Sequence, residues 1–149
     1  AQKYTCMDLE RVGFMDFGSD GRTLLSHSEF YKVNVCHGIV DKRLMAATLF
    51  SDHYKGTKPS MDSNAQAEHL IGDQQGKLLL VHGLLDSIGP AAGTLRIIDA
   101  LSRANKDFDM LLLPSEGHPP FVSRYALRRT WDYFVTHLQG ITPPREFEL

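Results

Sequence analysis

The hydrophobic positions of this chain fall into short continuous runs that do not alternate with polar positions. Four of these runs are predicted to be strands, over residues 11–15, 32–36, 77–82 and 108–113. Apolar runs of this length, without alternation, are typical of parallel strands that are buried on both faces. We therefore expect a parallel sheet of about four strands.

Two longer segments have apolar residues at helical spacing. The first covers residues 90–104, with Leu95, Ile98 and Leu101 on one face and a proline suited to the first turn. The second covers residues 123–138, where Ser123 is the expected N-cap and Gly140 the stop. Its predicted core stripe consists of Leu127, Trp131, Phe134, Val135 and Leu138.

A shorter helix is expected over residues 61–71, just before the third strand, whereas residues 41–60 have no clear pattern. Strands that alternate with helices predict an α/β fold, with a right-handed parallel sheet and helices on both faces. The 149 residues fit one domain, residues 1–149.

The composition argues against several classes of partner. A formal net charge of −2 provides no electrostatic footprint for nucleic acid or for an anionic membrane. No apolar run approaches the roughly 20 residues that span a bilayer. The two cysteines, Cys6 and Cys36, have neither metal-ligand nor redox spacing, so we expect no metal and no cofactor. The sequence does not indicate a compartment.

Candidate chemistry follows two of the predicted strands. Asp86 comes shortly after the run 77–82, and His118 comes shortly after the run 108–113. Neighbouring parallel strands end at the same edge of a sheet, so we expect these two side chains to meet there. A carboxylate that orients an imidazole is the acid–base pair of a catalytic triad.

From residue 8 to residue 149 the chain resembles the C-terminal half of the hydrolase domain of the prolyl oligopeptidase family, particularly its bacterial dipeptidyl-peptidase IV-like members. The matching segments are residues 8–13, 30–33, 76–83, 86, 99–101, 104–109, 111–114, 118, 128–134 and 143–147. The resemblance implies a truncated α/β-hydrolase fold. It also implies that Asp86 is the triad acid and His118 the triad base.

The same resemblance implies a nucleophile turn, Gly-x-Ser-x-Gly, directly after the first strand. Here residues 15–22 read Met-Asp-Phe-Gly-Ser-Asp-Gly-Arg. Without a gap, Gly18 stands at the serine position, whereas one inserted residue brings Ser19 there. We take Ser19 as the candidate nucleophile and the backbone N–H of Asp20 as an oxyanion donor. The alternative interpretation is an ordinary turn, which glycine, serine and aspartate all favour.

These observations predict a serine hydrolase that acts on carboxylic esters, and on small amides or peptides, through an acyl-enzyme. Ile88 replaces the asparagine with which the dipeptidyl peptidases contact their substrate, and only half of the family's domain is matched, so we expect broad and weak specificity. An exposed edge of a parallel sheet favours a homo-oligomer.

Two alternatives remain open. The altered nucleophile turn also fits a catalytically inactive remnant of a peptidase domain that serves as a binding or assembly module. Another nucleophile is the second alternative, with Cys36, Ser26 and Ser28 as candidates. Cys36 is the expected buried structural cysteine, because its strand neighbour His37 must point to the opposite face. His82, at the end of the third strand, is the expected packed histidine.

Overall fold

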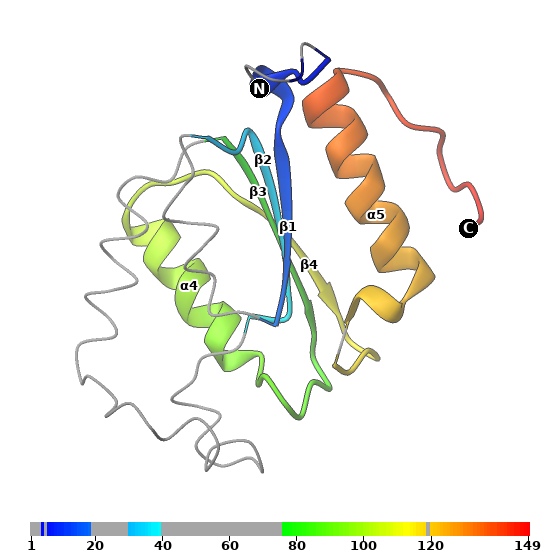
Figure 1. Ribbon diagram of the computed structural model, residues 1–149. Coiled ribbons are helices and arrows are strands. Elements are labelled where there is room, and N and C mark those ends of the chain that lie inside the picture. The colour runs from blue at the N-terminus through cyan, green and yellow to red at the C-terminus, as the bar shows by residue number, and fades with distance from the viewer. Residues whose placement is uncertain (1–3, 5, 19–29, 40–75, 119) are drawn as a thin grey trace.

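The computed structural model describes residues 4, 6–18, 30–39, 76–118 and 120–149. Four strands form its sheet: β1 (Gly13–Phe17), β2 (Val33–His37), β3 (Lys77–Gly83) and β4 (Asp109–Leu113). They pair in the order β1-β2-β3-β4, and every pair is parallel. The predicted four-stranded parallel sheet is confirmed (Figure 1).

The first strand begins and ends two residues later than the hydrophobic pattern predicted. Residues Leu9–Arg11 form a 3₁₀ turn, η1, in which the Asp8 carboxylate accepts the Glu10 N–H at 3.0 Å and pairs with Arg11 at 2.6 Å. This local capping of the turn outweighs the strand preference of the apolar residues beside it. The strand pairs with β2 as far as Phe17, opposite His37, so it ends directly before Gly18.

Among the described residues, one α-helix covers each face of the sheet (Figure 1). Helix α4 (Ala92–Arg103) lies on one face, and helix α5 (Arg124–Phe134) lies on the other. Alternate residues of the central strands β2 and β3 supply the two cores. The buried core on the α4 side is Cys36, Ile39, Leu78, Leu80 and Leu101. The buried core on the α5 side is Val35, Leu79, Val81, Leu113 and Ala126.

The predicted core stripe of α5 is wrong at its centre. Trp131 is 47% exposed, whereas the small residues Ala126 and Thr130 are fully buried. Small side chains let the helix approach the sheet closely, and the Thr130 hydroxyl lies 2.9 Å from Nε2 of the buried His37 on β2. In α4 the predicted core residue Leu95 is likewise exposed, at 48%.

The ends of α5 agree with the sequence. The Ser123 hydroxyl accepts the Ala126 N–H at 3.4 Å, which is the predicted N-cap. Past Phe134 the helix continues as a π-helical turn, η4 (Val135–Gln139), and Gly140 ends it with a left-handed φ of 69°. Helix α5 is also tied to the neighbouring strand, because the Tyr133 hydroxyl donates to Asp109 at 2.9 Å.

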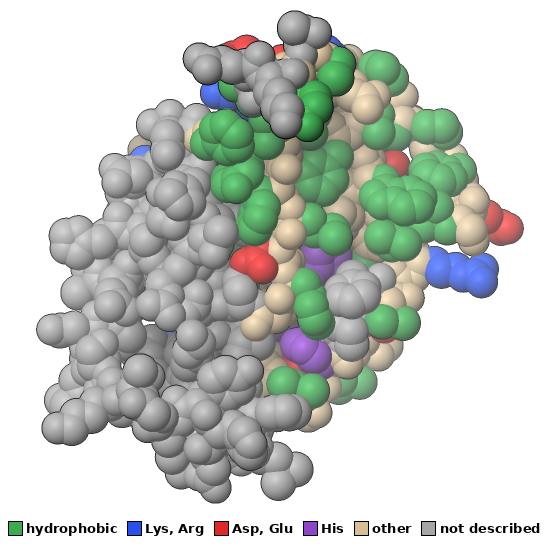
Figure 2. Space-filling model, in the orientation of Figure 1, with side chains coloured by type: hydrophobic (Ala, Val, Ile, Leu, Met, Phe, Trp, Pro, Cys, Tyr) green, Lys and Arg blue, Asp and Glu red, His purple; other side chains and the backbone are tan. Residues whose placement is uncertain are grey.

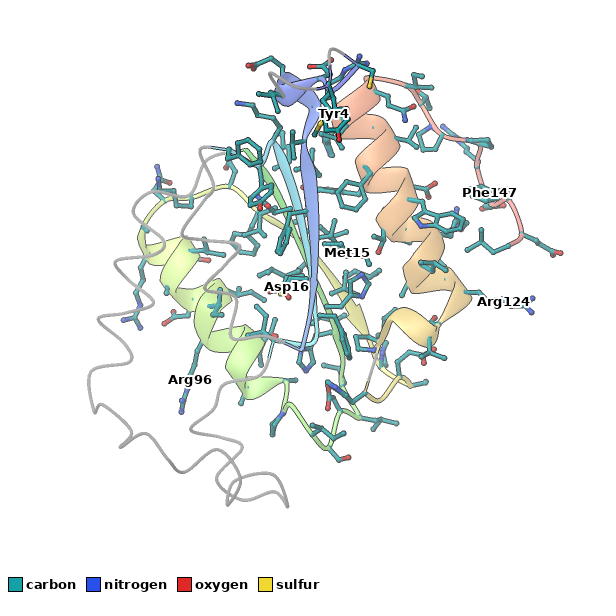
Figure 3. The ribbon with its side chains drawn as sticks, in the orientation of Figure 1. Tyr4, Met15, Asp16, Arg96, Arg124 and Phe147 are labelled. Carbon is teal, nitrogen blue, oxygen red and sulfur yellow. The ribbon has the colours of Figure 1, made fainter. Side chains whose placement is uncertain are left out.

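Strand β1 is an edge of the sheet and leaves large apolar side chains in solvent. Met15 is 51% exposed and Phe17 is 39% exposed. Figure 2 shows hydrophobic side chains gathered over β1 and α5, and Figure 3 shows Met15 and Asp16 pointing to opposite sides of the strand. Self-association through this edge stays a prediction.

The predicted helix over residues 61–71 and the unassigned residues 41–60 lie outside the described residues. Within the described ranges, no helix is long and apolar enough to cross a membrane.

We expect the folded state to lose stability as the pH falls below about 6.5. Burial lowers the pKa of His37 from 6.5 to about 4. As the pH falls, the unfolded chain therefore takes up a proton at His37 before the folded chain does. The full stability is present only above the unfolded-state pKa of 6.5. Between these two pH values the free energy of unfolding should fall by about 3 kcal/mol through this residue.

Urea unfolding followed by circular dichroism across this pH range tests the expectation. His37→Gln should reduce the pH dependence, although the buried His82 still contributes to it, and His137→Gln, at an exposed histidine of η4, should leave it unchanged. Equal slopes for the parent and His37→Gln would contradict the assignment.

Candidate active site

Three loops meet at the carboxyl end of the sheet. Asp86 lies in the turn after β3, His118 lies in the loop after β4, and Gly18 directly follows β1. Because all strands run in the same direction, these segments reach the same edge although they are far apart in the sequence (Figure 1). This is the edge at which open α/β sheets place their ligands.

The carboxylate of Asp86 is held in one orientation. Asp86 is only 6% exposed, and its Oδ1 accepts two backbone N–H groups, from Ile88 at 2.9 Å and from Gly89 at 2.7 Å. The other oxygen, Oδ2, lies 2.7 Å from Nδ1 of His118. A carboxylate fixed by two backbone donors has one oxygen left for the imidazole, so the predicted pair forms.

This pairing determines which nitrogen of His118 is available for chemistry. The Nδ1 atom donates to the carboxylate, so in the neutral imidazole Nε2 carries the lone pair. The ring is mostly enclosed, with 13% of its side chain exposed, and it stacks at a tilt on Phe17 with 5.2 Å between ring centroids. The His118 ring is therefore held between Asp86 and the last residue of β1.

Close backbone packing brings the two loops together. An added Cβ on Gly83 would lie 2.4 Å from the carbonyl oxygen of Glu116. Two hydrogen bonds from the residues that follow Gly83 join the same segments. The Leu84 N–H donates to Leu113 at 2.9 Å, and the Leu85 N–H donates to Glu116 at 3.0 Å.

Two glycines with positive φ bring the neighbouring strand ends to the pair. Gly38, with φ 59°, lies so close that an added Cβ would be 3.6 Å from both Asp86 Oδ2 and His118 Nδ1. Gly18, with φ 63°, donates its N–H to His37 at 3.0 Å. An added Cβ on Gly18 would lie 4.0 Å from Nε2 of His118.

The structure thus brings together two of the predicted catalytic residues, Asp86 and His118. The candidate nucleophile Ser19 and the candidate oxyanion donor Asp20 lie outside the described residues, as do Ser26 and Ser28. Cys36 is buried in the core that faces α4, as predicted, and it forms no disulfide.

The sequence pattern predicted His82 as a packing residue and did not indicate its polar partners. This histidine is fully buried at the end of β3. Its Nε2 lies 2.9 Å from the Gly89 carbonyl oxygen, and its Nδ1 lies 2.8 Å from the Thr94 hydroxyl. Burial lowers the pKa of His82, which keeps the ring neutral. The sequence feature that could have indicated these contacts is the position of His82, next to a glycine and close to Asp86.

The described part of the chain contains no group of three or more histidine, cysteine, aspartate or glutamate side chains that could hold a metal ion.

An acid on the loop after one parallel strand and a base on the loop after the next define an α/β-hydrolase site. The family model of the prolyl oligopeptidase family matches residues 21–140, and the chain belongs to this family of serine hydrolases. The matched range includes Asp86 and His118, whereas Gly18 and Ser19 lie before it.

Curated relatives include dipeptidyl peptidase 8 of Homo sapiens, 28% identical over 131 residues, and dipeptidyl peptidase family member 1 of Caenorhabditis elegans, 26% identical over 117 residues. The alignments cover 79% and 75% of this chain. They cover only 14% and 15% of the relatives, so the chain corresponds to a small part of those proteins.

Solved structures of peptidases share the fold. Dipeptidyl peptidase 4 of Porphyromonas gingivalis superimposes with a TM-score of 0.70 at 22% identity, over 89% of this chain and 20% of that chain. An acylaminoacyl peptidase in complex with Z-Gly-Gly-Phe-chloromethyl ketone has a TM-score of 0.74 at 18% identity, over 98% of this chain and 26% of that chain. These matches confirm the predicted α/β fold.

We expect Gly83→Ala to destabilise the chain by about 2 kcal/mol, because the added methyl would overlap backbone atoms of the loop that carries His118. Gly117→Ala is the matched control in the same loop, since among the described residues its added Cβ would meet only the Leu85 oxygen, at 3.8 Å. Thermal and urea unfolding of both variants measure the difference. Equal stability of the two variants would show that the loops do not depend on this contact.

Proposed function

We propose that this chain hydrolyses carboxylic esters, and small amides or peptides, through an acyl-enzyme. The observation that supports this proposal best is the hydrogen bond between Asp86 and His118, with Nε2 of the imidazole 4.0 Å from the position that a Cβ on Gly18 would take. This hydrogen bond joins two loops through a buried carboxylate and holds the imidazole in one tautomer, as general-base catalysis by a triad requires.

In the proposed reaction, Ser19 Oγ attacks the acyl carbon and Nε2 of His118 takes its proton. The same proton then passes to the leaving alcohol or amine, and an ester bond to Ser19 remains. Water attacks this acyl-enzyme, gives its proton to His118, and the acid leaves as Ser19 regains its hydrogen. Asp86 keeps the imidazole oriented and stabilises its positive charge throughout.

The proposed oxyanion donor is the backbone N–H of Asp20. The carboxylate of the same residue would stand close to a developing negative charge, which opposes its stabilisation. Loss of one effective oxyanion donor costs on the order of 3 kcal/mol in kcat. We therefore propose small activated esters as the best substrates, with peptides, the substrates that the names of the relatives indicate, turned over more slowly.

We expect p-nitrophenyl acetate and butyrate to be hydrolysed by the parent chain. The rate should fall by about a hundredfold or more in both Ser19→Ala and His118→Ala, because each removes one member of a unit that acts together. Ser115→Ala, an exposed serine in the loop before His118, is the matched control and should keep the parent rate.

All variants are compared at equal folded content by circular dichroism. Activity that disappears in His118→Ala but persists in Ser19→Ala would retain the base and exclude Ser19 as the nucleophile.

A second function is favoured by the position of Gly18. A hydroxyl carried on a Cβ at this residue would come within hydrogen-bond distance, about 3 Å, of Nε2 of His118. Gly18 also directly follows β1 and has a positive φ, as expected for the sharp turn that presents a nucleophile. We propose, as the alternative, that glycine replaces the nucleophile and that the chain is a binding or assembly module without turnover.

The alternative predicts a gain of function. Gly18→Ser should acquire stoichiometric labelling by a fluorophosphonate, which phosphonylates an activated serine with loss of fluoride, whereas the parent and the control Gly18→Ala should remain unlabelled. The positive φ should cost both variants about 1–2 kcal/mol of stability. Labelling of the parent chain that Ser19→Ala abolishes would exclude the alternative and support the acyl-enzyme.

A further inference from the structure

His82 is fixed at both ring nitrogens by neutral hydrogen bonds. A carbonyl oxygen can only accept, so the 2.9 Å contact with Gly89 places the ring proton on Nε2. Nδ1 then carries the lone pair and accepts the Thr94 hydroxyl at 2.8 Å. Thr94 belongs to the first turn of α4 and is itself buried, so the ring is held between a helix and the loop that follows β3.

The Gly89 backbone connects this histidine to the acid. The carbonyl group of Gly89 accepts from His82, while its N–H donates to Asp86 Oδ1 at 2.7 Å. Asp86 Oδ2 in turn accepts from His118 at 2.7 Å. A continuous chain of hydrogen bonds therefore runs from Thr94 in α4 to the base, and all of its members except His118 are buried.

Charge does not explain why a histidine occupies this place. His82 Nε2 lies 3.9 Å from Asp86 Oδ2, and its proton is already shared with the Gly89 carbonyl. The neutral ring leaves the Asp86 carboxylate to pair with His118 alone. What His82 supplies is a rigid donor that holds a glycine, the residue that would otherwise move most freely.

We infer that His82 is a positioning residue for the Asp86–His118 pair: it fixes Gly89, Gly89 fixes the Asp86 carboxylate, and the carboxylate fixes the tautomer of His118. The effect on turnover rests on the proposed hydrolysis, but the effect on the tautomer does not. A displacement of the acid by a fraction of an ångström is enough to weaken the orientation of the base.

The fold provides a matched control on the other face of the sheet. His37 is the last residue of β2 and His82 the last but one of β3. Both are fully buried, and each contacts the hydroxyl of a buried threonine on the helix that covers its face. The threonine partner of His37 is Thr130, which donates its own proton to the Ala126 carbonyl at 2.9 Å. No hydrogen bond described for Thr130 leads to Asp86.

The tautomer of His118 in its neutral form is read from long-range proton–nitrogen NMR correlations of the imidazole. The parent should show the Nδ1–H tautomer. His82→Leu should shift His118 toward the Nε2–H tautomer, and Thr94→Val should produce a smaller shift in the same direction. His82→Gln, whose amide can still donate to Gly89, should restore the parent pattern, and Thr130→Val should not alter it.

An unchanged tautomer in folded His82→Leu overturns the inference. If His82→Leu does not fold, the test is the comparison of Thr94→Val with Thr130→Val. Equal His118 spectra for these two variants overturn the inference. If the parent hydrolyses the ester probe, kcat should fall by about tenfold or more in His82→Leu, with partial recovery in His82→Gln. Absence of turnover in the parent refutes the proposed hydrolysis. The positioning role of His82 is then tested by the NMR measurement of the His118 tautomer alone.

Discussion

The close approach of the loop after β3 to the loop after β4 is the constraint on which the site depends. Gly83 lies against the Glu116 carbonyl at a distance that no side chain would allow, and the hydrogen bonds beside it tie the two loops together. Asp86 and His118 follow these contact points closely in the sequence. Their 2.7 Å hydrogen bond is therefore a result of backbone packing, and the side chains need little freedom to find each other.

The interior of the sheet is organised around two buried histidines as well as around aliphatic residues. His37 and His82 lie near the ends of the two central strands, and on opposite faces of the sheet each contacts a threonine hydroxyl of the covering helix. Buried polar rings of this kind are tolerated because they are neutral and hydrogen-bonded. Of the two histidines, only His82 is connected by described hydrogen bonds to Asp86, through Gly89. The two histidine–threonine contacts are therefore similar in packing but differ in their connection to the site.

The features that depend on strand direction could be predicted from the sequence. Parallel apolar strands end at one edge, and this rule alone is enough to bring Asp86 and His118 together. It did not predict that Trp131 would be exposed, because a hydrophobic pattern favours large residues, whereas the contact of α5 with the sheet uses Ala126 and Thr130. The choice between Gly18 and Ser19 depended on where β1 ends, and the strand ends at Phe17, two residues later than the hydrophobic pattern predicted.

The distribution of the two thiols has a practical consequence. Both cysteines of the chain are described, and they form no disulfide; Cys6 is exposed, ahead of β1 at the amino end of the strands, whereas Cys36 is buried in the α4-side core. A thiol-directed fluorophore or surface linker would therefore attach at Cys6, at the end of the sheet opposite His118. The chain already contains a single natural attachment point for immobilised assays, and its use leaves the loops of the site untouched.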